Sequence, residues 1–216
     1  MNDYKKEAAK ILRIIFTNAN GDSASTIRKY QGTSLPGFGI MLPRLKEIAS
    51  EYASSNDLCF ELIEKNTREA RIIAILVSEP LELTSSQIKR IEGNACTEEL
   101  RNYMARFILA PIITENGLQK LNNVVSTPLL LKATVQAYRM YKTMPPYSTC
   151  CQLLEQHIRK NCRPMADAQH LAEATYFFYK GNSSQFEEWL ETIPERNTPL
   201  AHTIDQWITD FSYQDF

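Results

Sequence analysis

Apolar residues recur along the chain with the spacing of an α-helix. One stripe follows the pattern i, i+3, i+4, i+7 over 42–52, and others cover 100–108, 130–141, 168–179 and 200–211. Alternating apolar and polar runs, which are typical of strands, are missing. The pattern therefore predicts an all-α protein in which each of these helices has one buried side. The residues expected in the core include Leu100, Phe107, Tyr138, Trp207 and Ile208.

Hydroxyl residues that can cap a helix stand before several of these stripes. Thr67, Thr97 and Thr127 follow one another at equal intervals, and Thr198 stands a little more than two such intervals later. Shorter helices are predicted between these anchors, at 56–65, 84–93, 114–124, 147–160 and 183–192. Helix pairs with a period of about 30–36 residues are typical of α-solenoids, in which each hairpin buries its apolar face against its neighbours.

We therefore expect a single HEAT-like domain over 1–216. It would comprise an N-terminal helical cap at 1–31, a structured loop at 32–42, and about six antiparallel helix pairs stacked over 43–211, with one concave surface. The loop is indicated by the three glycines and the proline of GTSLPGFGIML, which interrupt the helical pattern.

Composition and charge narrow the classes of function. The chain has 216 residues, 24 Lys and Arg against 25 Asp and Glu, and a formal net charge of -1. It lacks the basic excess of a dedicated nucleic-acid binder, although a neutral total is compatible with a local basic stripe. No apolar run approaches the length of a membrane span, and charges are mixed into the apolar N-terminus, so we expect no membrane partner. Five cysteines without a CxxC pair predict reduced core thiols in the cytoplasm.

Common catalytic and cofactor motifs are missing from the sequence. It contains no GxxxxGK[ST], HExxH, GxSxG or dinucleotide fingerprint, so we expect no small-molecule cofactor. His157 lies at helical spacing from Cys150, and Cys162 lies just past the end of that predicted helix. We interpret His157 as a packed core histidine and expect no metal site.

The segments LPRLKEIASEY and CFELIEKNTREARIIAILV resemble the first repeats of the DNA alkylation repair family of HEAT-like proteins, the AlkD-like group. Glu69, Ala70 and Arg71 match the second element of the family's hairpin, and weaker correspondence continues through 84–109, 127–141 and 164–180. Glu69 and Arg71 also suit an ordinary solvated helix start. The family's better-known members are glycosylases that remove positively charged alkylated purines. The resemblance implies duplex DNA as a partner, bound in a concave cleft that contains a carboxylate, a tryptophan and an arginine.

The resemblance assigns these three positions to residues of this chain. The carboxylate falls at Glu99, with Glu98 as the alternative, the tryptophan at Ala95, and the arginine approximately at Lys132. All three depart from the family pattern, because alanine cannot stack, glutamate is one methylene longer than aspartate, and lysine lacks the bidentate fork. Glu98 and Glu99 equally suit a helix N-terminus, whose dipole favours negative side chains.

Lys132 and Arg139 share the polar face of one helix, because they are seven residues apart. Together with Arg101 they would form a basic track for DNA on a concave face; the alternative is a set of scattered, solvated cations. The leading hypothesis is a DNA-binding HEAT-like protein of the alkylation repair type, with glycosylase activity left open. The alternative is a noncatalytic scaffold for a protein partner, which the slightly acidic pI and the missing tryptophan favour.

Overall fold

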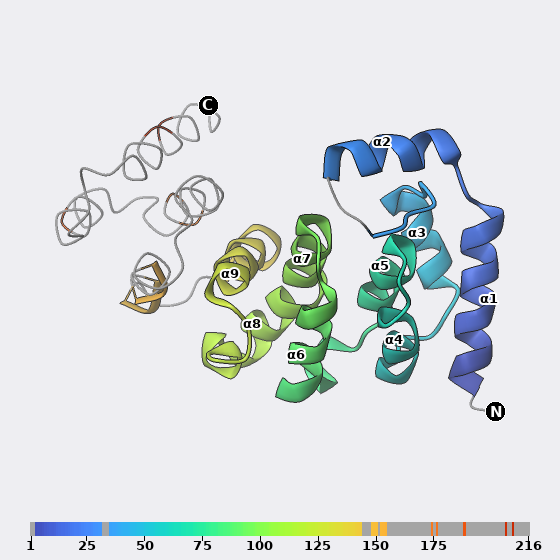
Figure 1. Cartoon of the computed structure of the whole chain (residues 1–216). Helices are drawn as coiled ribbons and strands as arrows, with labels where there is room; N and C mark the ends of the chain where they lie inside the picture. The colour runs from blue at the N-terminus through green and yellow to red at the C-terminus, as the bar shows by residue number, and fades with distance from the viewer. Residues whose placement is uncertain are drawn as a thin grey trace. The chain divides into compact units, whose positions relative to one another are not determined.

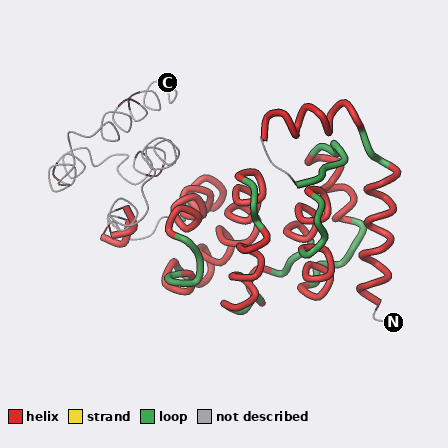
Figure 2. Tube along the Cα trace, in the orientation of Figure 1, coloured by secondary structure: helices red, strands yellow, loops and turns green. Residues whose placement is uncertain are grey.

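The computed structural model describes residues 3–31, 35–143, 148–150 and 152–154, together with residues 174, 176, 188, 206 and 209. Every regular element in this part of the chain is helical, which confirms the all-α prediction (Figure 1, Figure 2). The chain divides into two compact units, Met1–Glu115 and Asn116–Phe216, which are described separately. One repeat domain over 1–216 stays a prediction.

The elements follow one another with short connections. In chain order they are α1 (Asp3–Thr17), α2 (Gly21–Gln31), α3 (Leu42–Ser50), α4 (Asn56–Ile63), α5 (Arg68–Leu76), the 3-10 helix η1 (Pro80–Glu82), α6 (Ser85–Asn94), α7 (Glu98–Met104), the π segment η2 (Ala105–Leu109), α8 (Ala110–Asn116), the 3-10 helix η3 (Leu118–Leu121) and α9 (Thr127–Tyr141). The helices α1 and α2 occupy the segment expected for the N-terminal cap. The predicted helices 56–65 and 84–93 are confirmed as α4 and α6, with ends shifted by one or two residues.

Helix α5 lies at the centre of the first unit. It packs against α1, α3, α4 and α7, and α3, α5 and α7 follow one another in a row (Figure 1). Seven of the nine residues of α5 are buried, which leaves the helix almost no solvent-facing side. Two of the buried residues, Arg68 and Glu69, are charged. Side chains of this kind are almost never fully buried unless they are paired, so the packing of α5 requires partners for both charges.

Three threonines that were predicted to cap helices stand at or next to a helix start in the structure. Thr97 caps α7 as predicted, because its hydroxyl accepts the Leu100 N–H at 3.2 Å. Thr67 precedes α5 at the predicted position, but its side chain makes no capping hydrogen bond. The prediction for Thr127 is wrong by one residue: Ser126 occupies the N-cap, and Thr127 begins α9 with Pro128 in its first turn.

The helix that begins at Glu98 runs further than its stripe predicts. The Ala110 N–H donates to the Ala105 carbonyl, five residues earlier, so the helix widens to a π turn and then continues as α8. Pro111 follows immediately; it has no N–H for the Phe107 carbonyl, and wider turns commonly occur at such interruptions. Gly117, with φ of 76°, ends α8. A separate helix over 114–124 is therefore wrong: residues 114–116 belong to α8, and η3 occupies the middle of the predicted span.

The exposure of Leu100, Phe107 and Tyr138 tests their predicted place in the core. Leu100 is fully buried as predicted, but Phe107 and Tyr138 are only half-buried. Cations lie over both rings, which keeps one side of each ring toward the surface. Cys59 and Cys150 are buried thiols, whereas Cys96 is exposed, contrary to expectation.

Several predictions fall outside the described residues. They are the stripes over 168–179 and 200–211, the cap Thr198, the helix 183–192, most of the helix 147–160, the burial of Trp207 and Ile208, and the surroundings of His157, Cys151 and Cys162.

Candidate functional site

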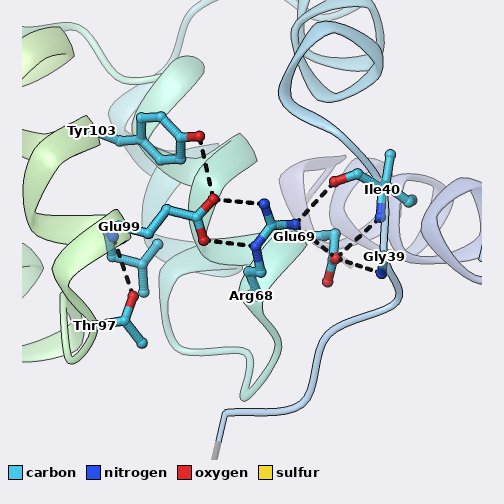
Figure 3. Close-up of polar contacts among 8 residues, drawn as sticks. Gly39, Ile40, Arg68, Glu69, Thr97, Glu99 and Tyr103 are labelled. Atoms are coloured by element: carbon cyan, nitrogen blue, oxygen red, sulfur yellow. Dashed lines mark hydrogen bonds and ion pairs between the residues drawn. The ribbon is translucent and has the colours of Figure 1, made fainter. Parts of the chain in front are cut away.

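Glu99, the residue that the family resemblance assigns as the carboxylate, lies in the first turn of α7 and faces Arg68 of α5 (Figure 3). Arg68 Nε donates to Glu99 Oε2 at 2.7 Å, and Arg68 Nη2 donates to Glu99 Oε1 at 2.6 Å. One turn further along α7, the Tyr103 hydroxyl donates to Oε1 at 3.2 Å. The Glu99 side chain is 18% exposed. Both of its oxygens are thus engaged by a bidentate, charge-assisted contact of the strong kind.

The other end of the Arg68 guanidinium meets Glu69 and the loop before α3. Arg68 Nη1 donates to Glu69 Oε1 at 3.0 Å and to the Ile40 carbonyl at 2.9 Å. Glu69 Oε1 also accepts the backbone N–H groups of Gly39 at 3.0 Å and Ile40 at 3.4 Å. Glu69 is fully buried, so its interpretation as part of a solvated helix start is wrong. We call Arg68, Glu69 and Glu99 the buried triad.

Residues 35–41 hold the loop side of the triad in place. The Asn20 N–H donates to the Phe38 carbonyl at 2.7 Å, which brings the loop against the start of α2. Gly39 has a φ of +78°, and a Cβ at this position would lie 2.3 Å from the Asn20 carbonyl oxygen. Only glycine fits such a position without displacement of the backbone. The loop therefore presents two N–H groups and one carbonyl to the triad in a defined arrangement.

The triad holds one guanidinium between two carboxylates. Burial by itself would lower the pKa of Arg68, but the hydrogen bonds and charge of Glu99, followed by those of Glu69, outweigh it, so the pKa lies above its ordinary value. Burial, together with the charge and hydrogen bond of Glu99, raises the pKa of Tyr103. Arg68 thus remains a cation and Tyr103 a neutral donor. Chemically, this arrangement orients Glu99 and partly neutralises it, because Glu99 shares the guanidinium with Glu69.

Sequence reasoning did not find Arg68 as the partner of Glu99. The repeated pattern T-x-E-x-R, which occurs as Thr67-x-Glu69-x-Arg71 and recurs as Thr97-x-Glu99-x-Arg101, marks the two glutamates as equivalent positions but does not select Arg68. The structure repeats as well: Arg71 Nε donates to the Lys65 carbonyl at 3.1 Å, and Arg101 Nε donates to the Ala95 carbonyl at 3.3 Å, each six residues earlier. The two glutamates of the pattern meet on Arg68.

The other residues predicted for the DNA-binding site differ in burial and in the unit to which they belong. Glu98 is exposed in the first turn of α7. Ala95 is buried at the C-cap of α6, so it does not share a helix with Glu99 and offers no open stacking wall. Arg101 is exposed in the first unit, whereas Lys132, half-buried, and Arg139, exposed, belong to α9 in the second unit. The basic track formed by these three residues stays a prediction.

Metal binding and membrane insertion find no support in the described part of the chain. That part contains no group of three or more His, Cys, Asp or Glu side chains that could hold a metal ion. Nor does it contain a helix with both the length and the apolar character needed to cross a bilayer.

A scan against protein-family models and comparisons with curated proteins and solved structures found no match to this chain. The resemblance to the DNA alkylation repair family stays a prediction, which rests on the residues of 42–52 and 59–77.

Proposed function

We propose that this chain is a HEAT-like repeat protein that binds duplex DNA without excising bases. The observation that carries the proposal is the bidentate pair between Arg68 and Glu99, which occupies the carboxylate that a glycosylase of this type would need. The family resemblance supports DNA as the partner.

The HEAT-like arrangement is supported by two successive hairpins in the first unit. In each of the pairs α4–α5 and α6–α7, the second helix begins with the same pattern of threonine, glutamate and arginine. The pattern starts at Thr67 in the first pair and at Thr97 in the next. Arg71 also links the two hairpins, because its Nη1 donates to the Asn94 carbonyl at the end of α6 at 2.9 Å. Arg90 of α6 pairs with Glu64 and lies over the Phe60 ring of α4 at 4.9 Å. Contacts between one hairpin and the next are what stacking in a solenoid requires.

The charges around Glu99 disfavour base excision. Removal of an alkylated purine passes through a sugar with oxocarbenium character, which a carboxylate stabilises through its negative charge. A guanidinium at 2.6–2.7 Å offsets part of that charge and engages both oxygens of Glu99. Ala95 cannot supply a stacking wall, because it is buried and has no ring. The paired carboxylate and the buried alanine therefore both disfavour turnover at this site.

The test uses the full chain in two assays. Fluorescence anisotropy with a labelled duplex, between about 20 and 200 mM salt, should show binding that weakens steeply as salt rises. Incubation with DNA that contains N7- or N3-methylpurines should release no base above that of a no-protein control. Salt-independent binding would remove the support for a DNA partner. Base release that Glu99→Gln abolishes and Glu98→Gln spares would make Glu99 a catalytic carboxylate and refute the noncatalytic proposal.

A protein-binding scaffold is the second candidate, and exposed apolar side chains of the first unit favour it. Phe16 of α1 and Met41 are 58% and 60% exposed, and the Phe16 ring contacts the Phe38 ring with centroids 4.7 Å apart. Apolar side chains of this size are typical anchors in protein interfaces. Absence of duplex binding at about 20 mM salt would favour this candidate over the first.

A further inference from the structure

Two cations from different elements converge on one aromatic ring in the first unit. Lys46 Nζ of α3 lies 5.1 Å from the centroid of the Phe107 ring, and Arg106 Cζ of the π segment lies 5.4 Å from the same centroid. Both α3 and the π segment pack against α5, so the side chains of the two elements that flank α5 meet at this ring. We call Lys46, Arg106 and Phe107 the cationic cluster.

The cluster adjoins the buried triad but is open to solvent. The Phe107 and Tyr103 ring centroids are 6.1 Å apart, and Tyr103 in turn donates to Glu99. Lys46 and Arg106 are exposed, and neither forms an ion pair with a carboxylate among the described residues. In contrast, Arg44, which precedes Lys46 on α3, pairs with Glu47 at 2.9 Å.

This geometry is suited to an anion. Two like charges near one ring repel each other, and an anion that contacts either cation lowers that repulsion. The ring face attracts both cations and restricts their side chains, so less conformational freedom is lost when they bind a ligand. The cluster therefore presents two positively charged side chains with restricted conformations, one on α3 and one on the π segment that continues α7.

We propose that Lys46 and Arg106 form a phosphate-contact site, at which the backbone of duplex DNA crosses the row formed by α3, α5 and α7. The inference rests on the proposed function, and it assigns DNA contacts to residues other than Arg101, Lys132 and Arg139. DNA is favoured over an acidic protein because the only apolar side chain of the cluster, Phe107, is half-buried and covered by the two cations. A protein interface would need an apolar anchor there, whereas a DNA backbone is contacted chiefly by lysine and arginine.

The experiment compares two double variants of the full chain. Lys46→Gln/Arg106→Gln neutralises the cluster, and Lys10→Gln/Arg13→Gln removes the same charge from two exposed positions of α1. Binding of a labelled duplex is measured as a function of salt. The cluster variant should bind roughly tenfold or more weakly at about 50 mM salt, and its log–log salt slope should fall by about 0.9 for each phosphate that it no longer neutralises, or about two units in total. The control variant should keep the wild-type slope.

A third variant separates charge from folding. Lys46→Arg/Arg106→Lys keeps both positive charges at the ring and should bind duplex DNA with the wild-type salt slope. Unchanged far-UV circular dichroism and an unchanged urea midpoint in the neutral variant would show that its weaker binding does not come from unfolding. Weaker binding with an unchanged salt slope would overturn the phosphate-contact site, because a removed phosphate contact must lower that slope.

The other outcomes separate the inference from the proposed function. Equal weakening of both neutral variants would show a general charge effect, which overturns the phosphate-contact site and leaves DNA binding intact. Failure of the wild type to bind duplex DNA at low salt would overturn the proposed function, and the inference with it. Binding of poly-glutamate but not of duplex DNA at the same ionic strength would assign the cluster to an acidic protein segment and overturn the inference.

Discussion

Replacing Arg68 by methionine tests whether the buried triad stabilises the first unit. Methionine keeps most of the apolar stem but removes four hydrogen bonds, two to Glu99, one to Glu69 and one to the Ile40 carbonyl. Glu69 would then remain fully buried with only the N–H groups of Gly39 and Ile40 as donors. Breaking a buried ion pair by removal of one partner typically costs about 3–5 kcal/mol. We expect a loss of this size, or about 9–15 °C in Tm at roughly 3 °C per kcal/mol.

The assay is urea unfolding at pH 7, followed by far-UV circular dichroism. The matched control is Arg44→Met, which removes an arginine from an exposed i,i+3 pair with Glu47 and should change the free energy of unfolding by no more than about 0.5 kcal/mol. Glu99→Gln keeps an acceptor oxygen for Tyr103 and should cost about 1.5–3 kcal/mol. Because the two residues interact directly, the double variant Arg68→Met/Glu99→Gln should cost less than the sum of the single variants.

A loss below about 1 kcal/mol for Arg68→Met, or strict additivity with Glu99→Gln, would refute this reasoning. Either result would mean that the ion pair does not offset the cost of burying its charges, as is known for some buried pairs. The proposal that Arg68 neutralises Glu99 would then lose its energetic support.

Three further predictions concern other residues of the first unit. Thr97→Val removes a capping hydrogen bond and should lower the free energy of unfolding in urea by about 1 kcal/mol. Thr67→Val should be neutral or stabilising, because the Thr67 hydroxyl is buried without a hydrogen-bond partner among the described residues. Equal losses for the two variants would contradict the capping assignment. Gly39→Ala should lower Tm strongly, because φ is positive at this residue and the new Cβ would lie 2.3 Å from a backbone oxygen. Gly37→Ala should have little effect, because its Cβ would meet other atoms only at 3.5 Å or more. Similar Tm values for the two variants would refute the conclusion that only glycine fits at position 39. Burial raises the pKa of the Cys59 thiol to about 12 from 9.0. The stability that the buried, protonated thiol contributes is therefore fully present below pH 9 and is lost as pH rises toward 12. The stability advantage of the wild type over Cys59→Ala should therefore shrink by about 2 kcal/mol between pH 8 and 10.5 in urea titrations, and a constant difference would exclude a buried thiol.

The helical pattern carried most of the information on the fold of the first unit. The stripes over 42–52 and 100–108 and the cap at Thr97 depend on neighbours three or four residues away, and such short-range rules can be read from a sequence. The end of α8 could not be read in this way. Its helix passes Pro111 by means of a π turn and stops at Gly117, whereas the spacing of the threonine anchors predicted a separate helix over 114–124.

The candidate site was predicted only in part for a similar reason. Glu99 could be selected from the family pattern, but its partner Arg68 stands on the preceding hairpin and lies inside the unit, where burial makes the pairing necessary. Local rules assign both Glu69 and Glu99 to the helix dipole, because both stand in the first turn of a helix. Only the packing of α5 against α7 shows that the two carboxylates share one guanidinium.

The matching turns before α5 and α7 also suggest how chains of this type could change in length. Deletion of residues 68–97 would join Thr67 to Glu98 and give the sequence Thr-Glu-Glu-Leu-Arg, which keeps the threonine, the glutamate and the arginine that close the turn. A second copy of the same segment inserted at this junction would preserve the pattern equally well. Gain or loss of this 30-residue unit would thus leave each turn chemically intact, whereas a deletion of another length after Thr67 would not restore the Thr-x-Glu-x-Arg pattern. Unequal recombination could therefore lengthen or shorten the protein in discrete steps.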